Sequence, residues 1–311
     1  MRTSIKVFAP ATVANVVCGY DILGFAVNAP GDEVVMRTSE TPGIQITKIT
    51  GDDGRLPLDP EKNTVSVSVK HYLEAIDRPD FGVEIELHKK MPIGSGLGSS
   101  SASTVAGLFA VNKLLDNQLS DEELLPFAMK GEELACGHGH ADNVAPALLG
   151  GFILIRSYSP LDIIKLPYPK NLYCAIVFPD VVVPTRDARQ LIRSKVLLKD
   201  AVTQWGNIAG LVSGLFMNDL SLIGRSMQDI LVEPVRAILI PDFYKLREIA
   251  LEHGALSFGI SGSGPSVFSF AGDEQTAHKI TQVLQSHLAS LNIASKSYVS
   301  AINAEGPKIL D

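Results

Sequence analysis

A glycine- and serine-rich run at residues 92–103 (Pro-Ile-Gly-Ser-Gly-Leu-Gly-Ser-Ser-Ser-Ala-Ser) sets the strongest limit on how this chain can fold. It follows residues 81–88, where strict alternation of apolar and polar side chains predicts a β-strand. It leads into residues 103–115, where apolar side chains recur at helical spacing. Backbone N–H groups and the positive end of the helix dipole face such a loop. The segment is therefore interpreted as an anion-binding loop.

This loop differs from the two best-known phosphate-binding loops. A Walker loop needs Gly-Lys-Ser/Thr, and residues 92–103 contain no lysine. A dinucleotide-binding fingerprint needs a strand after its helix, whereas a second helix is predicted over residues 121–136, with Ser120 and Glu123 at the spacing of a capping box. On local features alone, a loop that only caps the helix stays an alternative.

Composition and charge narrow the class of protein. Hydrophobic residues make up 46% of the 311 residues and charged residues 20%, as in ordinary globular proteins. The net charge of -7 and the lack of a basic run argue against nucleic acid and anionic membranes as partners. The longest uncharged stretch, residues 91–112, begins with Gly, Ser and Pro and is interpreted as a loop and a helix, not a membrane span. Small molecules are the expected substrates.

The cysteines and the N-terminus predict a cytoplasmic protein. Cys18, Cys136 and Cys174 are odd in number and form no C-x-x-C pair, which favours a reducing compartment. The first residues lack the apolar core of an export signal.

The length of 311 residues fits two domains, and Gly150-Gly151 predicts the boundary between them. Residues 1–150 mix strands and helices and are predicted to be α+β. Residues 151–311 are predicted to contain a strand at 173–178, several helices between 186 and 252, a glycine-rich turn at 260–265 between two short strands, a helix at 274–288 and a last strand near Ser297.

Other candidate site residues are ambiguous in isolation. Glu132 and a serine of the loop could hold a hard cation, or Glu132 and Glu133 could form a solvated helix face. His138 and His140 could bind a metal, but no third ligand is evident. Single arginines such as Arg236 more often form surface salt bridges than bind a carboxylate.

Taken together, the motifs resemble the GHMP kinase superfamily. The chain carries an N-terminal motif at residues 9–24, the glycine- and serine-rich loop at 92–103 and a second glycine-rich turn at 259–265, in the order of the superfamily. Residues 140–151, Asp187-Ala-Arg189 and Glu233-Pro-Val-Arg236 resemble its homoserine-kinase branch. One departure is Val16-Val17-Cys18, where many members have Leu-Gly-Pro.

The resemblance implies a two-domain α+β fold with the active site between the domains. Residues 1–150 would form an α+β domain with a left-handed βαβ crossover, and residues 151–311 a ferredoxin-like α+β domain. The implied activity is Mg²⁺-dependent transfer of the γ-phosphate of ATP to the hydroxyl of L-homoserine, in threonine biosynthesis. The implied state is a cytoplasmic homodimer.

The resemblance also assigns roles to residues. The ATP phosphates would be wrapped by Pro92, Ile93, Gly94, Ser95, Gly96, Leu97, Gly98, Ser99, Ser100 and Ser101. Mg²⁺ would be held by Ser100 and Glu132, with Ser99 as a rival to Ser100. The acceptor would be surrounded by Asn15, Asp21, His140, Asp142, Arg189, Arg236 and Gly262. Asp142 would act with Ser100 and Glu132 in catalysis, as a general base or by orienting the substrate.

The chemistry of homoserine agrees with this residue set. Asp21 suits its ammonium group, Arg189 and Arg236 suit its carboxylate, and Asp142 suits its hydroxyl group. Mevalonate and shikimate have a carboxylate but no ammonium group, so a kinase for either would leave Asp21 without its role. A nucleotide-binding sensor without catalysis and a nicotinamide oxidoreductase are rivals from other classes.

Overall fold

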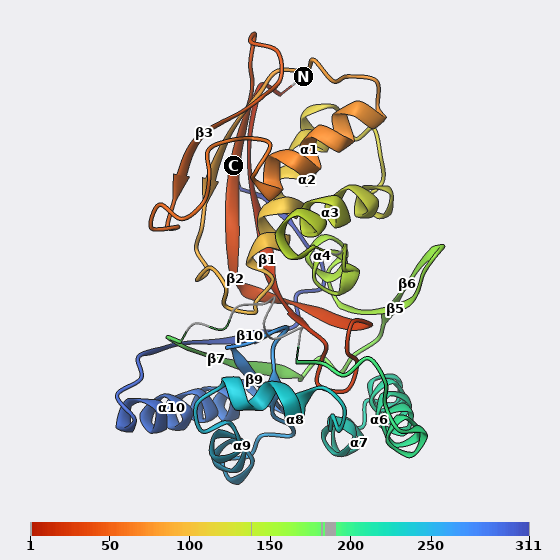
Figure 1. Cartoon of the computed structure of the whole chain (residues 1–311), viewed down its shortest axis with the longest axis vertical. Helices are drawn as coiled ribbons and strands as arrows, with labels where there is room; N and C mark the ends of the chain where they lie inside the picture. The colour runs from red at the N-terminus through yellow and green to blue at the C-terminus, as the bar shows by residue number, and fades with distance from the viewer. Residues whose placement is uncertain (1, 138, 182, 184–190, 311) are drawn as a thin grey trace.

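The computed structural model describes residues 2–137, 139–181, 183 and 191–310. These residues form two α+β units, each built on one β-sheet and stacked along the long axis of the molecule (Figure 1). The described residues include no helix long and apolar enough to cross a membrane. The predicted two-domain α+β fold is confirmed.

The first sheet has the order β11-β1-β2-β4-β3, with β5 paired to β2 and β6 paired to β5. Its strands are β1 (Ser4–Ala14), β2 (Leu23–Thr38), β3 (Ile44–Thr50), β4 (Val83–His88), β5 (Phe152–Tyr158), β6 (Leu161–Leu166) and β11 (Lys308–Leu310). β3 and β4 pair in parallel and are connected through α1 (Thr64–Ala75), which makes the expected βαβ unit. The strand predicted at 81–88 is β4.

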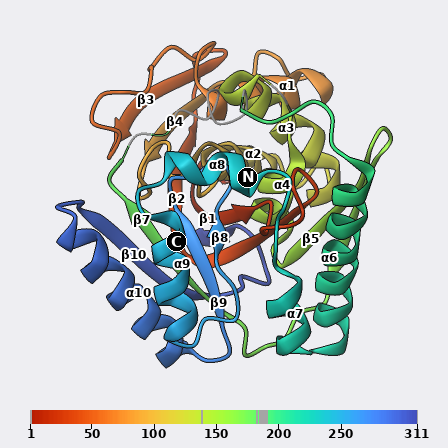
Figure 2. The same ribbon diagram turned by 60° about the horizontal axis from the view of Figure 1, so that its bottom comes forward.

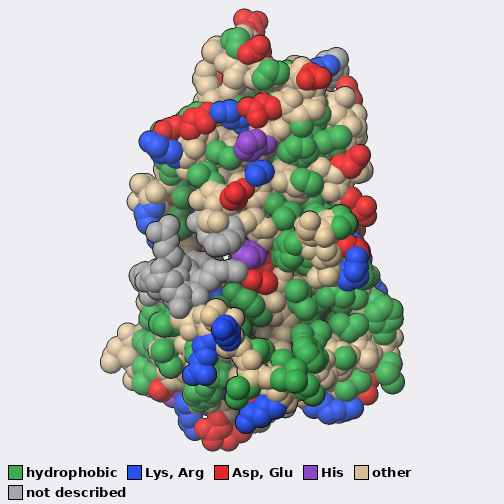
Figure 3. All heavy atoms as spheres, turned by 45° about the vertical axis from the view of Figure 1, so that its right-hand side comes forward, with side chains coloured by type: hydrophobic (Ala, Val, Ile, Leu, Met, Phe, Trp, Pro, Cys, Tyr) green, Lys and Arg blue, Asp and Glu red, His purple; other side chains and the backbone are tan. Residues whose placement is uncertain are grey.

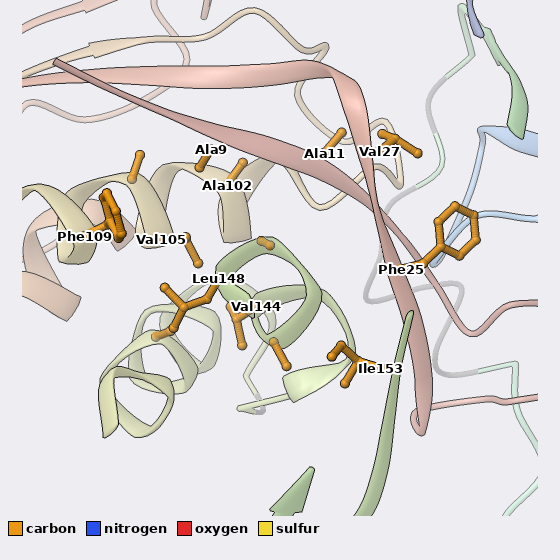
Figure 4. Close-up of a cluster of buried hydrophobic side chains, with 14 of the residues drawn as sticks. Ala9, Ala11, Phe25, Val27, Ala102, Val105, Phe109, Val144, Leu148 and Ile153 are labelled. Atoms are coloured by element: carbon orange, nitrogen blue, oxygen red, sulfur yellow. The ribbon is translucent and has the colours of Figure 1, made fainter. Parts of the chain in front are cut away.

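Four helices cover one face of this sheet: α1, α2 (Ser99–Leu114), α3 (Asp121–Cys136) and α4 (Ala141–Leu149) (Figure 1). The central helix, α2, is buried at almost every position because it packs against β1 and β2 as well as α1, α3 and α4. Figure 4 shows Ala102 and Val105 of α2 between Ala9 of β1 and the α4 side chains Val144 and Leu148. Small side chains at this contact let α2 approach the sheet closely, which fixes its N-terminus.

The helix α2 begins at Ser99, four residues before the predicted start at Ser103. Gly98 is its N-cap, with a left-handed backbone at φ +63°. The serines that follow do not stay in the loop. They form the first turn of the helix, so their hydroxyls and N–H groups surround its N-terminus.

The second sheet has the order β10-β7-β9-β8, and all of its pairs are antiparallel. Its strands are β7 (Tyr173–Pro179), β8 (Gly259–Ile260), β9 (Val267–Ala271) and β10 (Ser295–Ala301). In chain order this is 4-1-3-2 with helices in the two crossovers, which is the expected ferredoxin-like topology. Its helices are α6 (Leu198–Met217), α7 (Leu220–Ser226), α8 (Glu233–Arg236), the 3₁₀ turn η1 (Ala237–Leu239), α9 (Phe243–Glu252) and α10 (Glu274–Ser290). Figure 2 shows α6 and α7 on the opposite side of this unit from α9 and α10.

The sheets do not divide the chain at the predicted boundary. The strands β5, β6 and β11 all follow residue 150, yet they pair within the first sheet. A domain division at Gly150-Gly151 therefore stays a proposal, and strand pairing favours a division after Leu166.

Candidate active site

A cleft of about 860 Å³ lies where the two units meet, and both units line it. It collects most of the residues predicted from sequence: Asn15, Asp21, Ile93, Gly94, Ser95, Gly96, Gly98, Ser99, Ser100, Ser101, Glu132, His140, Asp142, Arg236 and Gly262. Leu97 is instead buried in the hydrophobic core, and Pro92 does not line the cleft. Arg189 and His138 lie outside the described residues.

The glycine-rich loop is held in a shape that needs its glycines. Gly94, Gly96 and Gly98 all have positive φ, at +73°, +77° and +63°. A Cβ atom on Gly96 would meet the carbonyl oxygens of Ser261 at 2.5 Å and Gly264 at 2.7 Å. A Cβ atom on Gly94 would meet nothing within 4 Å, so that part of the loop is open to a ligand. No side chain caps the N-terminus of α2, whose first N–H groups suit an anion.

A buried ion pair supports this loop from below. The Lys89 ammonium contacts the Asp32 carboxylate and donates to the Ser99 carbonyl oxygen and the Ser103 hydroxyl, each at 2.7 Å. Asp32 also accepts from the backbone N–H of Lys90 at 2.8 Å. Burial lowers the pKa of Lys89, while the charge of Asp32 opposes that shift. The pair ties β2 and the end of β4 to the first turn of α2.

Glu132 of α3 brings a buried carboxyl group to the same helix end. Burial is the largest cause of its raised pKa, and the Ser100 and Ser101 hydroxyls and the charge of Lys89 act in the opposite direction. Glu133, in contrast, is exposed, and its carboxylate pairs with Lys130 at 3.0 Å. The two carboxyl groups therefore differ. Glu132 faces the cleft, where it could hold a cation, whereas Glu133 belongs to the solvated face of the helix.

The two candidate serines also differ. The Ser99 side chain is buried, and its hydroxyl lies 3.4 Å from the Asp32 carboxylate. The Ser100 hydroxyl lies against Glu132 and lines the cleft. A carboxylate and a hydroxyl at a helix N-terminus are suitable oxygen ligands for Mg²⁺, which uses few protein ligands when phosphates supply others. This geometry favours Ser100 over Ser99.

The turn at residues 259–265 joins the three motifs. The Gly262 carbonyl oxygen accepts hydrogen bonds from Asn15 Nδ2 at 2.9 Å and Arg236 Nη1 at 3.0 Å. Its N–H donates to the Ala14 carbonyl oxygen at 3.2 Å. The Ser261 hydroxyl donates to the Gly96 carbonyl oxygen at 2.8 Å. One turn of the second unit thus holds both the N-terminal motif and the glycine-rich loop.

A second part of the cleft combines opposite charges. His140 Nδ1 lies 3.8 Å from Asp21 Oδ1. The Asp21 backbone N–H donates to Asn15 Oδ1 at 3.0 Å. The buried Arg236 guanidinium lies over the Tyr20 ring, with 5.1 Å between its Cζ atom and the ring centroid. Asp142 is buried in the first turn of α4 and also lines the cleft.

The sequence reasoning missed several residues that line or adjoin the cleft. Tyr158 does not line it, but its hydroxyl donates to the Asp21 carbonyl oxygen at 2.7 Å and accepts from the Ala141 N–H at 3.3 Å. Its ring also lies edge-on to His140, 6.4 Å between centroids. Others line the cleft: Leu56, Pro57, Lys62, Asn63, Thr64, Leu87, Lys89 and Asn143. Two of them had a signal in the sequence, because Lys89 lies three residues before the loop and Asn143 belongs to the motif at residues 140–151.

The part of the chain that the structure describes has no cluster of side chains that could bind a metal ion without other ligands. No group of three or more His, Cys, Asp and Glu side chains there is arranged to hold an ion. The alternative of a metal at His138 and His140 stays untested, because His138 lies outside the described residues.

Family models match both halves of the chain. The description "GHMP kinases N terminal domain" matches residues 63–151, and "GHMP kinases C terminal" matches residues 208–290. The homoserine kinase of Chlorobium phaeovibrioides is 48% identical, covering 99% of each chain. That of Chlorobium phaeobacteroides strain BS1 is 46% identical, covering 97% of this chain and 98% of the relative.

Solved structures agree with these matches. The crystal structure of homoserine kinase from Cytophaga hutchinsonii is 59% identical, covers 100% of this chain and 98% of that chain, and superposes with a TM-score of 0.97. Mevalonate kinase of L. major, at 15% identity and a TM-score of 0.74, shares the fold. The resemblance inferred from the three motifs is confirmed, and the chain belongs to the GHMP kinase family, within its homoserine-kinase branch.

Proposed function

We propose that this chain transfers the γ-phosphate of ATP to the hydroxyl of L-homoserine, giving O-phospho-L-homoserine and ADP. The observation that carries the proposal is a single cleft with two chemically different ends. One end has a glycine-rich helix N-terminus beside buried Glu132. The other has Asp21 and Arg236, which suit the ammonium and carboxylate groups of an amino acid.

The nucleotide end fits ATP with Mg²⁺. Backbone N–H groups of the loop and of the first turn of α2 would bind phosphate oxygens, and the helix dipole would favour their negative charge. Glu132 and Ser100 would hold Mg²⁺, which when bound neutralises charge on the phosphoryl group. The side chains of Leu56, Pro57 and Leu87 offer apolar surface for the base.

The acceptor end would orient homoserine. Arg236 would bind the carboxylate, together with Arg189, and Asp21 and Asn15 would bind the ammonium group. His140 would lie beside Asp21 near the reacting hydroxyl. Phosphoryl transfer asks a protein mainly for positioning and charge stabilisation, and a primary alcohol can lose its proton late in the reaction. We therefore propose that Asp142 orients the hydroxyl instead of removing its proton.

The biological setting follows from the reaction. We propose a cytoplasmic enzyme of threonine biosynthesis that works as a homodimer.

The test is ADP release measured with a panel of acceptors: L-homoserine, mevalonate, shikimate and galactose. We expect turnover with homoserine and only background hydrolysis with the other three. Preference for mevalonate or shikimate would contradict the assignment of Asp21 and indicate another kinase of the family. Nucleotide binding without turnover on any acceptor would indicate a sensor.

A further inference from the structure

The short helix α8 carries Arg236 to the cleft, and its first residue, Glu233, is a second buried charged group. Charged side chains are scattered over the surface of the molecule, as Figure 3 shows for one face. The Glu233 side chain is instead only 7% exposed. Burial raises the pKa of its carboxyl group, and the charge of Arg247 opposes that shift. A buried carboxylate lowers stability unless it is paired, so the contacts of Glu233 decide what it can do.

One oxygen of Glu233 is held by the next helix. Arg247 of α9 donates from Nη2 to Glu233 Oε1. The Arg247 guanidinium also lies over the rings of Phe243 and Tyr244, with 5.0 and 5.7 Å between its Cζ atom and the ring centroids. These rings favour one position of the cation. The ion pair therefore ties α8 to α9.

The other oxygen of Glu233 lies beside the turn at residues 259–265. A Cβ atom on Gly259 would meet Glu233 Oε2 at 3.3 Å. This oxygen is buried and has no hydrogen-bond partner within the described residues. Three residues further along both segments, Arg236 Nη1 donates to the Gly262 carbonyl oxygen at 3.0 Å. The two charged side chains of α8 thus lie against the two ends of the same turn.

Arg236 lies between the cleft and a small inner cavity. This cavity has a volume of about 20 Å³, and Asp229, Glu233 and Arg236 are among its walls. The residues that line both the cavity and the cleft are Asn15, Tyr20, Arg236 and Gly262. The carboxyl groups of α8 and of the segment before it therefore lie behind the arginine that would meet the acceptor.

Asp229 fixes the start of α8. Its carboxylate accepts from the backbone N–H groups of Leu231 at 2.8 Å, Val232 at 3.1 Å and Glu233 at 2.8 Å. A helix of four residues has little stability of its own, so its direction depends on such contacts. The pair of Glu233 with Arg247 adds a second contact at the same end.

From these contacts we propose that Glu233 and Arg247 act as one unit that positions Arg236 for the carboxylate of the acceptor. Neither side chain lines the cleft, so both would act through Arg236 and the turn at residues 259–265. This inference rests on the proposed function, in which Arg236 binds the carboxylate of homoserine, and adds the residues that aim it.

The test compares Glu233→Gln, Arg247→Met and the double variant with wild type. Each single variant should raise the homoserine KM roughly 3- to 30-fold, because groups in one network commonly couple by such factors. The KM for ATP and kcat should stay close to wild type. The double variant should be no worse than Arg247→Met, since residues that act as a unit are not additive. It also buries no unpaired charge, so it keeps the test open if Arg247→Met fails to fold.

The matched control is Glu248→Gln, which breaks an exposed ion pair on the same helix α9. There the Lys245 ammonium lies 2.8 Å from the Glu248 carboxylate. The control should leave both KM values at those of wild type. Calorimetry of homoserine binding in the absence of nucleotide should rank the variants as the homoserine KM does.

Other outcomes would overturn the inference. An unchanged homoserine KM in the variants would remove Glu233 and Arg247 from acceptor recognition and leave the proposed function in place. A rise in both KM values together with lower melting temperatures would show a role in stability alone. Additive effects in the double variant would show that the two residues do not act as one unit. Absence of homoserine-dependent ADP release by wild type would instead overturn the proposed function, and this inference with it.

Discussion

At the scale of single residues, Glu132 has conflicting effects on stability and activity. It is buried, and burial raises its pKa, so the ionised carboxylate that Mg²⁺ would require is unfavourable in the ligand-free protein. A carboxyl group whose pKa is raised in the folded state binds its proton more tightly there. The free energy of unfolding therefore decreases as pH rises from the unfolded pKa through the folded one. Functional sites often retain residues that lower the stability of the folded protein in this way.

We predict that Glu132→Gln lowers kcat and raises ligand-free stability. The kcat should fall by about 100-fold or more, because a bound metal supplies several kcal/mol of charge stabilisation in the transition state. The melting temperature without ligands should exceed that of wild type at pH 7, and the difference should shrink near pH 4, where the wild-type carboxyl group is protonated. Steady-state kinetics and thermal melts at both pH values check this.

The control for this change is Glu133→Gln, at an exposed position beside it. It should leave both kcat and melting temperature close to wild type. If Glu132→Gln keeps wild-type turnover at saturating Mg²⁺, Glu132 is not a metal ligand.

A second prediction concerns Tyr158. Its hydroxyl forms hydrogen bonds with the backbone of Asp21 and with the backbone of Ala141 at the start of α4. Tyr158→Phe should raise the KM for homoserine roughly 2- to 12-fold, since a hydrogen bond is worth about 0.5 to 1.5 kcal/mol net. The KM for ATP should stay unchanged. Tyr298→Phe on β10, outside the cleft, is the control. Equal effects on both KM values would indicate a general loss of structure.

At the scale of elements, the loop at 92–98 and the helix after it show which structural features local sequence patterns can predict and which they cannot. The strand, the loop and the helix were predicted from alternation, glycine content and apolar spacing, because these patterns are local. The start of α2 was misplaced by four residues. Ser99 to Ser101 are weak helix formers by themselves, and their helical state depends on the Lys89 and Asp32 pair beneath them. That pair joins β2 to β4 across 57 positions and leaves no local pattern.

The same loop gives a prediction about close packing. Gly96→Ala should lower stability more than Gly94→Ala. Both positions have positive φ, which costs alanine about 1 to 2 kcal/mol, but only at Gly96 would a Cβ atom meet backbone oxygens. Chemical denaturation without ligands measures the difference. Equal losses would show that the turn at 259–265 can move away from the loop at little cost.

At the scale of the whole molecule, the two units are not two consecutive halves of the chain, because strands from the second half pair within the first sheet. The three ordered motifs predicted the family, the α+β fold and about half of the residues that line the cleft. They did not predict that β5, β6 and β11 belong to the first sheet, since pairing between distant strands depends on tertiary packing. The chain therefore crosses between the two units more than once.

This crossing predicts how ligands stabilise the protein. Gly262 bonds to Asn15 and Ala14 of the first unit, and Ser261 bonds to Gly96, so a ligand in the cleft touches both units at their joint. Each ligand at about 100 times its Kd should add about 2.7 kcal/mol of stability. Calorimetry with an unreactive ATP analogue, Mg²⁺ and homoserine should therefore show one transition that moves upward as a whole. Ser261→Ala, which leaves the Gly96 carbonyl oxygen without this donor, should reduce that shift. Two separate transitions, only one of which responds to ligands, would mean that the turn at 259–265 does not couple the units.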